Sequence, residues 1–361
     1  MRSMRNRAKI RSFLGFLAFL ALTVSWLSEP ETVARAAAGG LKLCAQVLIP
    51  ALFPFLALAG LCVRRDYGRY LSPVLRPLMG PLFGLPDEGA GALALGAVGG
   101  YPVGAATAFA LYDRGALTAD ETARLLSFCN NAGPSFILGV AGAVLFRSAC
   151  TGVLLLAAHL LAALLTGSLL RAPAPRVGKR AAGRPAAAAR EEPFAVSFTA
   201  AVSTAAGSML SVCAFVVFFS VLTPFLLHLG ALEPGARLLG ALSGCGEAAA
   251  RAVLTGALEL SSGVAALGAS GCPRGVLLSA VSFLLGWGGL CVHGQVASLR
   301  GLRPVSLRPY LLGKLCQGAL AAVLIQFLSR GRLALLLLPA LLAILAPLWK
   351  NRAGKSPLPG V

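Results

Sequence analysis

Residues 117–139, LTADETARLLSFCNNAGPSFILG, begin as a helix and then interrupt it inside an apolar run. Thr118 and Glu121 form the S/T-x-x-E capping box that starts a helix. This helix reaches Asn130 after about three turns, where Pro134 cannot donate a hydrogen bond to the carbonyl of Asn130. Unpaired polar groups are costly in an apolar medium, so the stretch predicts a broken helix whose polar groups face protein or a cavity.

The composition is that of a membrane protein. Of the 361 residues, 57% are hydrophobic and 12% are charged, whereas soluble domains carry about 25% charged residues. The net charge of +19 comes from Arg and Lys in the N-terminus, short loops, one linker and the tail. That is the pattern of cytoplasmic loops beside anionic lipid, and no basic module suited to nucleic acid is present.

We expect an all-α polytopic membrane fold with about eight or nine transmembrane helices and one or two re-entrant or broken helices. The basic loop 64–86 and the linker both suit the cytoplasm, which requires an even number of crossings between them. Three apolar segments lie there, 89–112, 125–146 and 149–170, so either one is re-entrant or the linker faces outward. The expected divisions are 1–33 (basic N-terminus and signal-anchor helix, with a cleaved signal peptide as the alternative), 34–170 (first membrane half), 171–193 (basic Pro/Ala/Arg linker), 194–330 (second membrane half) and 331–361 (C-terminal helix and basic tail).

The two membrane halves are weakly similar, and their opening helices run in opposite directions under this topology. An inverted repeat with broken helices is typical of secondary transporters, although apolar Gly-rich segments also align by chance. The matched pairs are 40–56 with 207–226 (GLKLCAQVLIPALFPFL and GSMLSVCAFVVFFSVLTPFL), 99–111 with 288–299 (GGYPVGAATAFAL and GGLCVHGQVASL), and 126–133 with 314–320 (LSFCNNAG and KLCQGAL).

Four polar breaks supply the candidate substrate-binding residues. At the first, the amide side chains either bond to a neighbouring helix or face a ligand. At the second, GGYPVG, a tyrosine ring and hydroxyl become available, and a tightly packed kink is the alternative. The candidates are Asn130, Asn131, Gly133 and Pro134 at the first break, and Gly100, Tyr101 and Pro102 at the second.

The other two breaks lie in the second half. GALELSSG at 256–263 holds Glu259 and Ser262, and an acidic residue inside an apolar stretch indicates a functional site unless it is solvated at the interface. GWGGLCVHGQ at 286–295 holds His293 and Gln295. Two residues apart, these side chains point to different faces of a helix, and His293 equally suits an interhelical contact.

No arrangement of residues indicates catalysis. The chain has no nucleophile–base pair, no phosphate-binding loop and no metal-ligand spacing, and its nine cysteines are scattered without a C-x-x-C motif. We therefore expect no enzyme, catalytic residue, metal or cofactor. The expected partners are membrane lipid, a small polar solute, and other membrane proteins or a second copy of the chain.

The segment at 89–139, GAGALALGAVGGYPVGAATAFALYDRGALTADETARLLSFCNNAGPSFILG, resembles the nucleoside-recognition, or Gate, domain, in particular sporulation integral membrane proteins of the YlbJ type. LELSSGVAAL at 258–267, SFLLGWGGLCVHGQVASL at 282–299 and RPYLLGKLCQGALAAVL at 308–324 are similar to later motifs of that family. The resemblance covers roughly residues 35–330, but ELSSG departs from the family's usual Thr followed by Asn or Gly.

This resemblance implies a multi-pass protein of the cytoplasmic membrane in an endospore-forming bacterium, required for forming the spore cortex. The helix breaks, which would line a cavity, favour a transporter-like or permease-like function for a small polar solute, such as a nucleoside or a cortex-related metabolite. A non-transporting scaffold for cortex-assembly partners is the alternative, because a shared fold does not supply a function.

Overall fold

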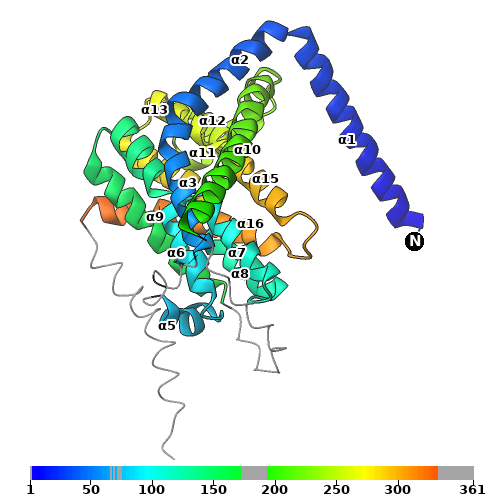
Figure 1. The fold of residues 1–361 in the computed structure, drawn as a ribbon. Helices are drawn as coiled ribbons and strands as arrows, with labels where there is room; N and C mark the ends of the chain where they lie inside the picture. Colours follow the sequence, from blue (N-terminus) through cyan, green and yellow to red (C-terminus); the bar gives the residue numbers. More distant parts are fainter. Residues whose placement is uncertain (1, 66, 68–69, 71–74, 172–192, 332–361) are drawn as a thin grey trace, which may run out of the picture.

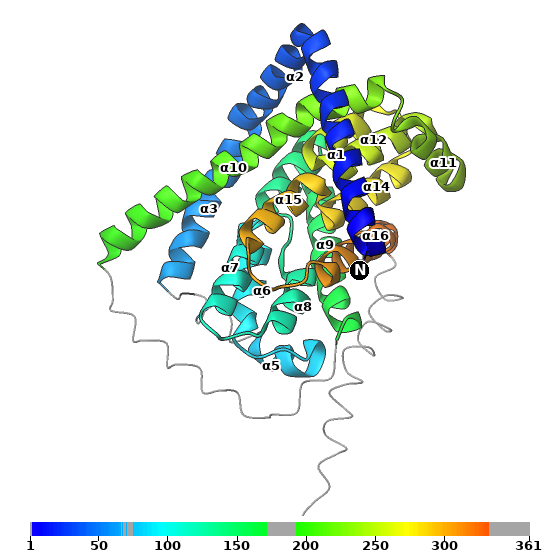
Figure 2. The same ribbon diagram turned by 90° about the vertical axis from the view of Figure 1, so that its right-hand side faces the viewer.

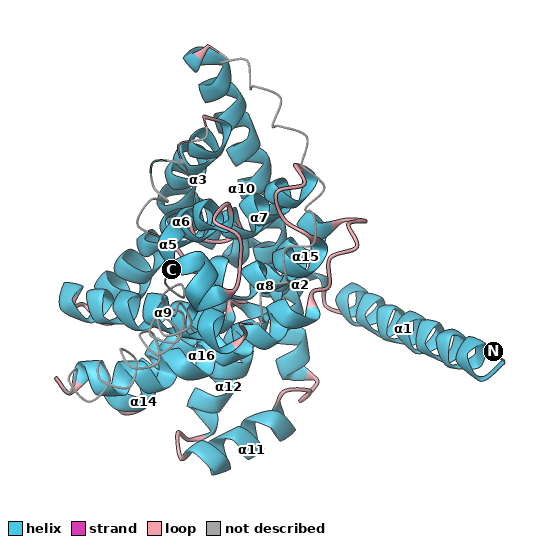
Figure 3. Ribbon diagram, turned by 90° about the horizontal axis from the view of Figure 1, so that it is seen from below, coloured by secondary structure: helices cyan, strands magenta, loops and turns pink. Residues whose placement is uncertain are grey.

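The computed structural model describes residues 2–65, 67, 70, 75–171 and 193–331. Within these ranges the chain forms helices and loops and no strand, which confirms the all-α class (Figure 3). The linker between the two halves and the expected C-terminal helix and tail lie almost entirely outside the described residues.

Four helices of the described part are long and apolar enough to cross a membrane, and a fifth is counted if a pair bent by 96° near residue 29 is one span. A multi-pass protein is thus supported, whereas eight or nine spans are not confirmed. Two of the expected spans, 89–112 and 125–146, are each divided by a break into helices of 11 residues. An α-helix of that length is about 16 Å long, which is half of a bilayer core. The long helices are α9 (Ala149–Leu169), α10 (Phe194–His228), α14 with α15 (Arg274–Trp287 and Gly289–Arg300) and α16 (Arg308–Ser329).

Two pairs of short helices form hairpins. Helix α6 (Gly89–Gly99) packs against α7 (Val103–Asp113), and α12 (Glu247–Leu258) packs against α13 (Leu260–Ala269). Figures 1 and 2 place the first hairpin in the lower part of the body and the second in the upper part. The GGYPVG break is therefore a reversal of the chain and not the kink that was the alternative.

The other two breaks interrupt helices without folding them back. Helix α8 (Ala119–Cys129) begins at the expected capping box, ends at Asn130 in extended conformation and continues as the π-helix η3 (Ser135–Leu145) after Pro134. Helices α14 and α15 are separated at Gly288, which has a φ of +88°. The order of hairpin, broken helix and long helix thus occurs twice in the described chain.

The two broken helices run in opposite directions. Gly142 of η3 contacts Gly152 near the start of α9, and Phe128 of α8 contacts Gly167 near the end of α9. The segment α8–η3 is therefore antiparallel to α9. Arg274, at the start of α14, donates a hydrogen bond to Thr151 at the start of α9 at 3.1 Å. Near the end of α14, Gly286 contacts Gly318 of α16, next to Gln317, which donates to the carbonyl oxygen of His159 in the middle of α9. Helix α14 therefore runs parallel to α9.

This course places the loop 64–86 and the start of the linker relative to each other. The first of the three apolar segments returns to its starting end as a hairpin, and the other two run in opposite directions. Phe83, in the loop, contacts Gly167 near the end of α9, so the loop and the start of the linker lie at the same end of the body.

The remaining helices frame this core. Helix α10 packs along α2 and α3, whose sequences contain the expected opening segment of the first half. Helix α1 extends away from the body in Figure 1 and meets it at Trp26, which packs edge-on against Phe218. The bounds are α1 Arg2–Ser28, α2 Pro30–Leu43, η1 Cys44–Leu48, α3 Ile49–Arg64, α5 Arg76–Leu78, η2 Met79–Phe83 and α11 Glu233–Ser243.

An ion pair just beyond the apolar segment 89–112 joins the first hairpin to the loop after α15. Arg303 Nε and Nη2 donate to Asp113 Oδ1 and Oδ2 at 2.7 and 2.6 Å, and these hydrogen bonds lower the pKa of Asp113. A carboxyl group whose pKa is lowered by folding stabilises the folded protein when the pH is above the ordinary pKa of that group. This contribution to stability is lost as the pH falls through the lowered pKa.

We expect Asp113→Asn to destabilise the protein by no more than about 1 kcal/mol at neutral pH, because both side chains are partly exposed and screened by solvent. The difference from wild type should shrink as the solution is acidified, and thermal unfolding over a pH series measures it. Asp87→Asn, at an exposed carboxylate in the preceding loop, is the matched control. An Asp113→Asn effect that grows on acidification would contradict the ion-pair explanation.

Candidate functional site

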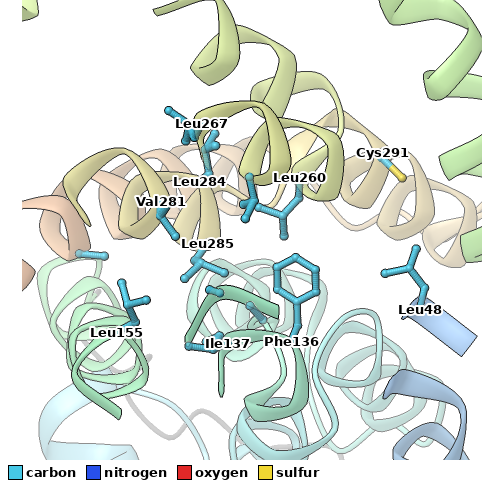
Figure 4. Close-up of a cluster of buried hydrophobic side chains, with 14 of the residues drawn as sticks. Leu48, Phe136, Ile137, Leu155, Leu260, Leu267, Val281, Leu284, Leu285 and Cys291 are labelled. Carbon is cyan, nitrogen blue, oxygen red and sulfur yellow. The ribbon is translucent and has the colours of Figure 1, made fainter. Parts of the chain in front are cut away.

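The four helix breaks meet at one cavity of about 60 Å³. Each break contributes to its wall, through Tyr101, Gly133, Glu259 and Gly288. In Figure 4, Phe136 and Leu260 point toward each other across the space between η3 and α13. The other lining residues are Leu48, Leu52, Ala132, Phe136, Val212, Val216, Leu260, Ser261, Cys291, Val292 and Gln295.

The cavity divides the sequence candidates into two groups. Tyr101, Gly133, Glu259 and Gln295 line it. The other candidates stand next to the cavity or behind its wall. They are Gly100, Pro102, Asn130, Asn131, Pro134, Ser262 and His293.

Tyr101 connects the first hairpin to the second broken helix. It lies at the hairpin tip, between Gly100 with a φ of +75° and Pro102, to which it is joined by a cis peptide bond. Its hydroxyl donates to the carbonyl oxygen of Leu285 on α14 at 2.8 Å. One face of the cavity therefore depends on a contact between the two halves.

Glu259 is a buried helix cap and not a solvated interfacial residue. Its side chain is 2% exposed, and its carboxylate oxygens accept hydrogen bonds from the backbone N–H groups of Ser261 and Ser262 at 2.9 and 2.6 Å. A carboxylate is stabilised by the positive end of a helix dipole, here that of α13. Since it has about four acceptor positions, a cavity-facing carboxylate can also accept hydrogen bonds from a solute.

The asparagines of the first break bond to the protein. Asn130 Oδ1 accepts from the backbone N–H of Ala105 at 3.3 Å, which ties the break to α7. Asn131 Nδ2 donates to the carbonyl of Phe128 at 2.9 Å, and its Oδ1 accepts from Gln317 Nε2 at 2.8 Å. Of the two interpretations of these amides, the geometry favours the contact between helices.

Lys314 is the main functional candidate that sequence reasoning missed. It is fully buried on α16, and its Nζ donates to the carbonyl oxygen of Asn130 at 2.7 Å and to Gln317 Oε1 at 2.6 Å. His159 on α9 joins the same cluster, because its Nε2 accepts from the backbone N–H of Ala132 at 3.1 Å. The signal was present in KLCQGAL, where a charged residue lies inside an apolar helix.

The side chains of His293 and Gln295 lie on different faces of α15 and contact different groups, as their spacing predicts. His293 Nδ1 is 2.9 Å from the Tyr310 hydroxyl, and its ring meets Trp287 edge-on at 4.3 Å. Gln295 lines the cavity on the other face of α15, where its Nε2 donates to Cys291 Sγ at 3.6 Å.

The chain is 29% identical over 348 residues to the sporulation integral membrane protein YlbJ of Bacillus subtilis (strain 168). The aligned region covers 90% of this chain and 84% of that protein. The resemblance to the YlbJ type is confirmed. Similarity to YlbJ and the long apolar helices together support a multi-pass membrane protein. No family model and no solved structure matches the chain, so the nucleoside-recognition part of the resemblance stays a prediction.

Proposed function

We propose that this chain acts in sporulation as a transporter-like membrane protein that carries a small polar solute through the cavity at the helix breaks. The observation that carries the proposal is the convergence of four breaks, two from each half, on one cavity. Irregular backbone is tolerated at membrane depth where it lines a cavity, and secondary transporters bind their substrates at such sites. A nucleoside or a cortex-related metabolite is the proposed solute, with no enzymatic step and no cofactor.

The arrangement of the two halves supports the inverted repeat within this proposal. Hairpin, broken helix and long helix occur in the same order twice, and the two broken helices run in opposite directions. The corresponding segments differ from those that the sequence suggested, because GGYPVG turns a hairpin whereas GGLCVHGQ continues a broken helix. In the proposed repeat, GGYPVG corresponds to GALELSSG and the asparagine break corresponds to Gly288.

In the proposed transport cycle, this small cavity belongs to a closed conformation. Its volume of about 60 Å³ is well below the about 300 Å³ or more that ligand pockets commonly have. A nucleoside would enter only after the hairpin tips separate. Such closure around a site is the usual way in which transporters and lidded enzymes isolate a bound solute.

Uptake of radiolabelled nucleosides into proteoliposomes tests the transport proposal. We expect Glu259→Gln to reduce uptake at least about tenfold. The amide has no charge, and its NH₂ group would face one of the two backbone N–H groups at the start of α13 that Glu259 now accepts from. Glu247→Gln, at an exposed carboxylate of the same hairpin, should leave uptake unchanged. If Glu259→Gln and Asn131→Ala both transport at the wild-type rate, the cavity is not the solute site.

A scaffold for cortex-assembly partners is the second candidate function. The observation in its favour is that the asparagines and Lys314 bond to other parts of the chain, which suits a rigid membrane framework. Crosslinking in sporulating cells separates the two functions. A stable partner complex and intact cortex in a cell carrying both Glu259→Gln and Asn131→Ala would support the scaffold over the transporter.

A further inference from the structure

Lys314 places an ammonium group where the two halves of the protein meet. None of its surface is exposed, and its Nζ is held by two neutral oxygens, those of the Asn130 backbone and the Gln317 side chain. The Tyr101 ring lies 5.3 Å from Nζ, at a distance suited to a cation–π contact. In the described part of the chain, no carboxylate forms an ion pair with this lysine.

The backbone oxygen that holds Nζ comes from the first helix break. Asn130 is the residue at which α8 ends, and position 134, whose N–H would bond to this carbonyl in a continuous helix, is a proline. Unwound backbone carbonyls at such breaks are the groups that coordinate cations in secondary transporters. In this protein, a side chain of the opposite half supplies the positive charge at that position.

We propose that Lys314 is the resident cation of this junction, and that binding and release of its proton, not of a metal ion, controls whether the two halves stay joined. When the ammonium releases a proton, an N–H bond breaks, the nitrogen keeps the electron pair, and a water molecule becomes hydronium. The neutral amine forms weaker hydrogen bonds to Asn130 and Gln317, because charge-assisted bonds are about twice as strong as neutral ones. This inference rests on the proposed function and names its coupling ion.

The groups that face Lys314 from the surrounding elements are neutral or weakly polar. His159 accepts a backbone hydrogen bond at Nε2, which leaves that nitrogen unprotonated. On α14, the residues that contact α16 are Ser279, Phe283 and Gly286, none of which titrates in this range. The titratable groups near Nζ are Cys129 on α8, His159 on α9, His293 on α15, Tyr101 at the hairpin tip and Tyr310 on α16.

Amide hydrogen exchange of the full chain in lipid nanodiscs tests the inference without a solute. The readout is exchange of residues 130–136, corrected for the pH dependence of the chemical rate. In the wild type we expect exchange to become at least about tenfold faster between pH values of about 5.5 and about 9.5, since junction opening exposes these amides. Replacing Na⁺ by a large organic cation should change nothing.

Three variants test whether the pH dependence of exchange comes from the charge of Lys314 or from a general change in structure. Lys314→Met should exchange rapidly at every pH, Lys314→Arg should exchange slowly at every pH, and Lys42→Met, at an exposed lysine of α2, should behave as wild type. Wild-type pH dependence in Lys314→Met, or slower wild-type exchange in Na⁺, would overturn the inference.

If Lys314→Met does not fold, Lys314→Arg decides alone, because an alkaline acceleration that persists in it also overturns the inference. Failure of nucleoside uptake would leave these exchange results intact. A flat exchange profile alongside active uptake would reject only the role of the lysine, so the two proposals fail separately.

Discussion

Gln317→Leu should lower the stability of the folded protein by about 3–5 kcal/mol, because it removes one partner from a buried charged cluster. The Gln317 side chain accepts from Lys314 Nζ at 2.6 Å and donates to Asn131 Oδ1 at 2.8 Å. Leucine can do neither, so the ammonium keeps one strong acceptor and the Asn131 oxygen loses its interhelical donor. A buried polar group without a partner costs about 1–3 kcal/mol, and a charged one costs more.

Thermal unfolding of the purified protein in detergent measures this loss. Gln326→Leu is the matched control on the same helix, since Gln326 Nε2 also bonds across to α14, at Gly275 O and Ser279 Oγ. That contact lies near the end of α16 and is only partly buried, so water can replace the lost bonds and we expect a loss below about 1 kcal/mol. If the two substitutions lower the stability equally, burial of the Lys314 cluster does not determine how much its hydrogen bonds contribute to the stability of the fold.

The local features of the site could be read from the sequence because they depend on neighbouring residues. The capping box at Thr118 and Glu121 forms as predicted, and α8 ends at Asn130 before Pro134. Each of these outcomes involves groups within one or two turns of helix. Burial of Glu259 was also within reach, since it is the one acidic residue in its apolar stretch.

The course of the chain after each break could not be read in the same way. An apolar segment of 20 to 25 residues suits a transmembrane span, yet 89–112 turns back at Gly100 whereas 125–146 continues past Asn131. The difference depends on packing with residues far away in the sequence, such as Leu285, whose carbonyl holds the Tyr101 hydroxyl. Hydropathy carries no record of such contacts, so it did not distinguish the hairpin from the broken helix.

The polar network needed the same long-range information. Asn130 and Asn131 indicated polar groups that need hydrogen-bond partners. Those partners, Lys314 and Gln317, lie more than 180 residues away in the sequence. A lone lysine in an apolar helix was the available signal for these partners. In the sequence it belongs to a possible repeat and to a motif of the family resemblance, and neither pattern identifies the groups that it contacts.

Gly96→Ala is expected to disrupt the first hairpin and to prevent stable folding of the protein. A Cβ atom at position 96 would overlap the carbonyl oxygen of Cys129 and lie 2.9 Å from Gly104 Cα. A Cβ atom at Gly104 of α7 would overlap the same carbonyl, so both hairpin helices pack closely against it and against each other. Overpacking a core with a flexible side chain costs about 1–3 kcal/mol, and a clash between backbones should exceed this range.

Gly91→Ala is the matched control for this substitution, because it adds the same methyl group to the same helix. No atom lies within 4 Å of a Cβ built at Gly91. Alanine favours helix by about 1 kcal/mol over glycine, so Gly91→Ala should be neutral or slightly stabilising. Gly96→Ala should therefore abolish the thermal unfolding transition or lower its midpoint strongly, whereas Gly91→Ala should leave the midpoint unchanged or raise it slightly. If Gly96→Ala instead unfolds at or above the wild-type temperature, the hairpin does not enclose Cys129 as closely as the structure places it.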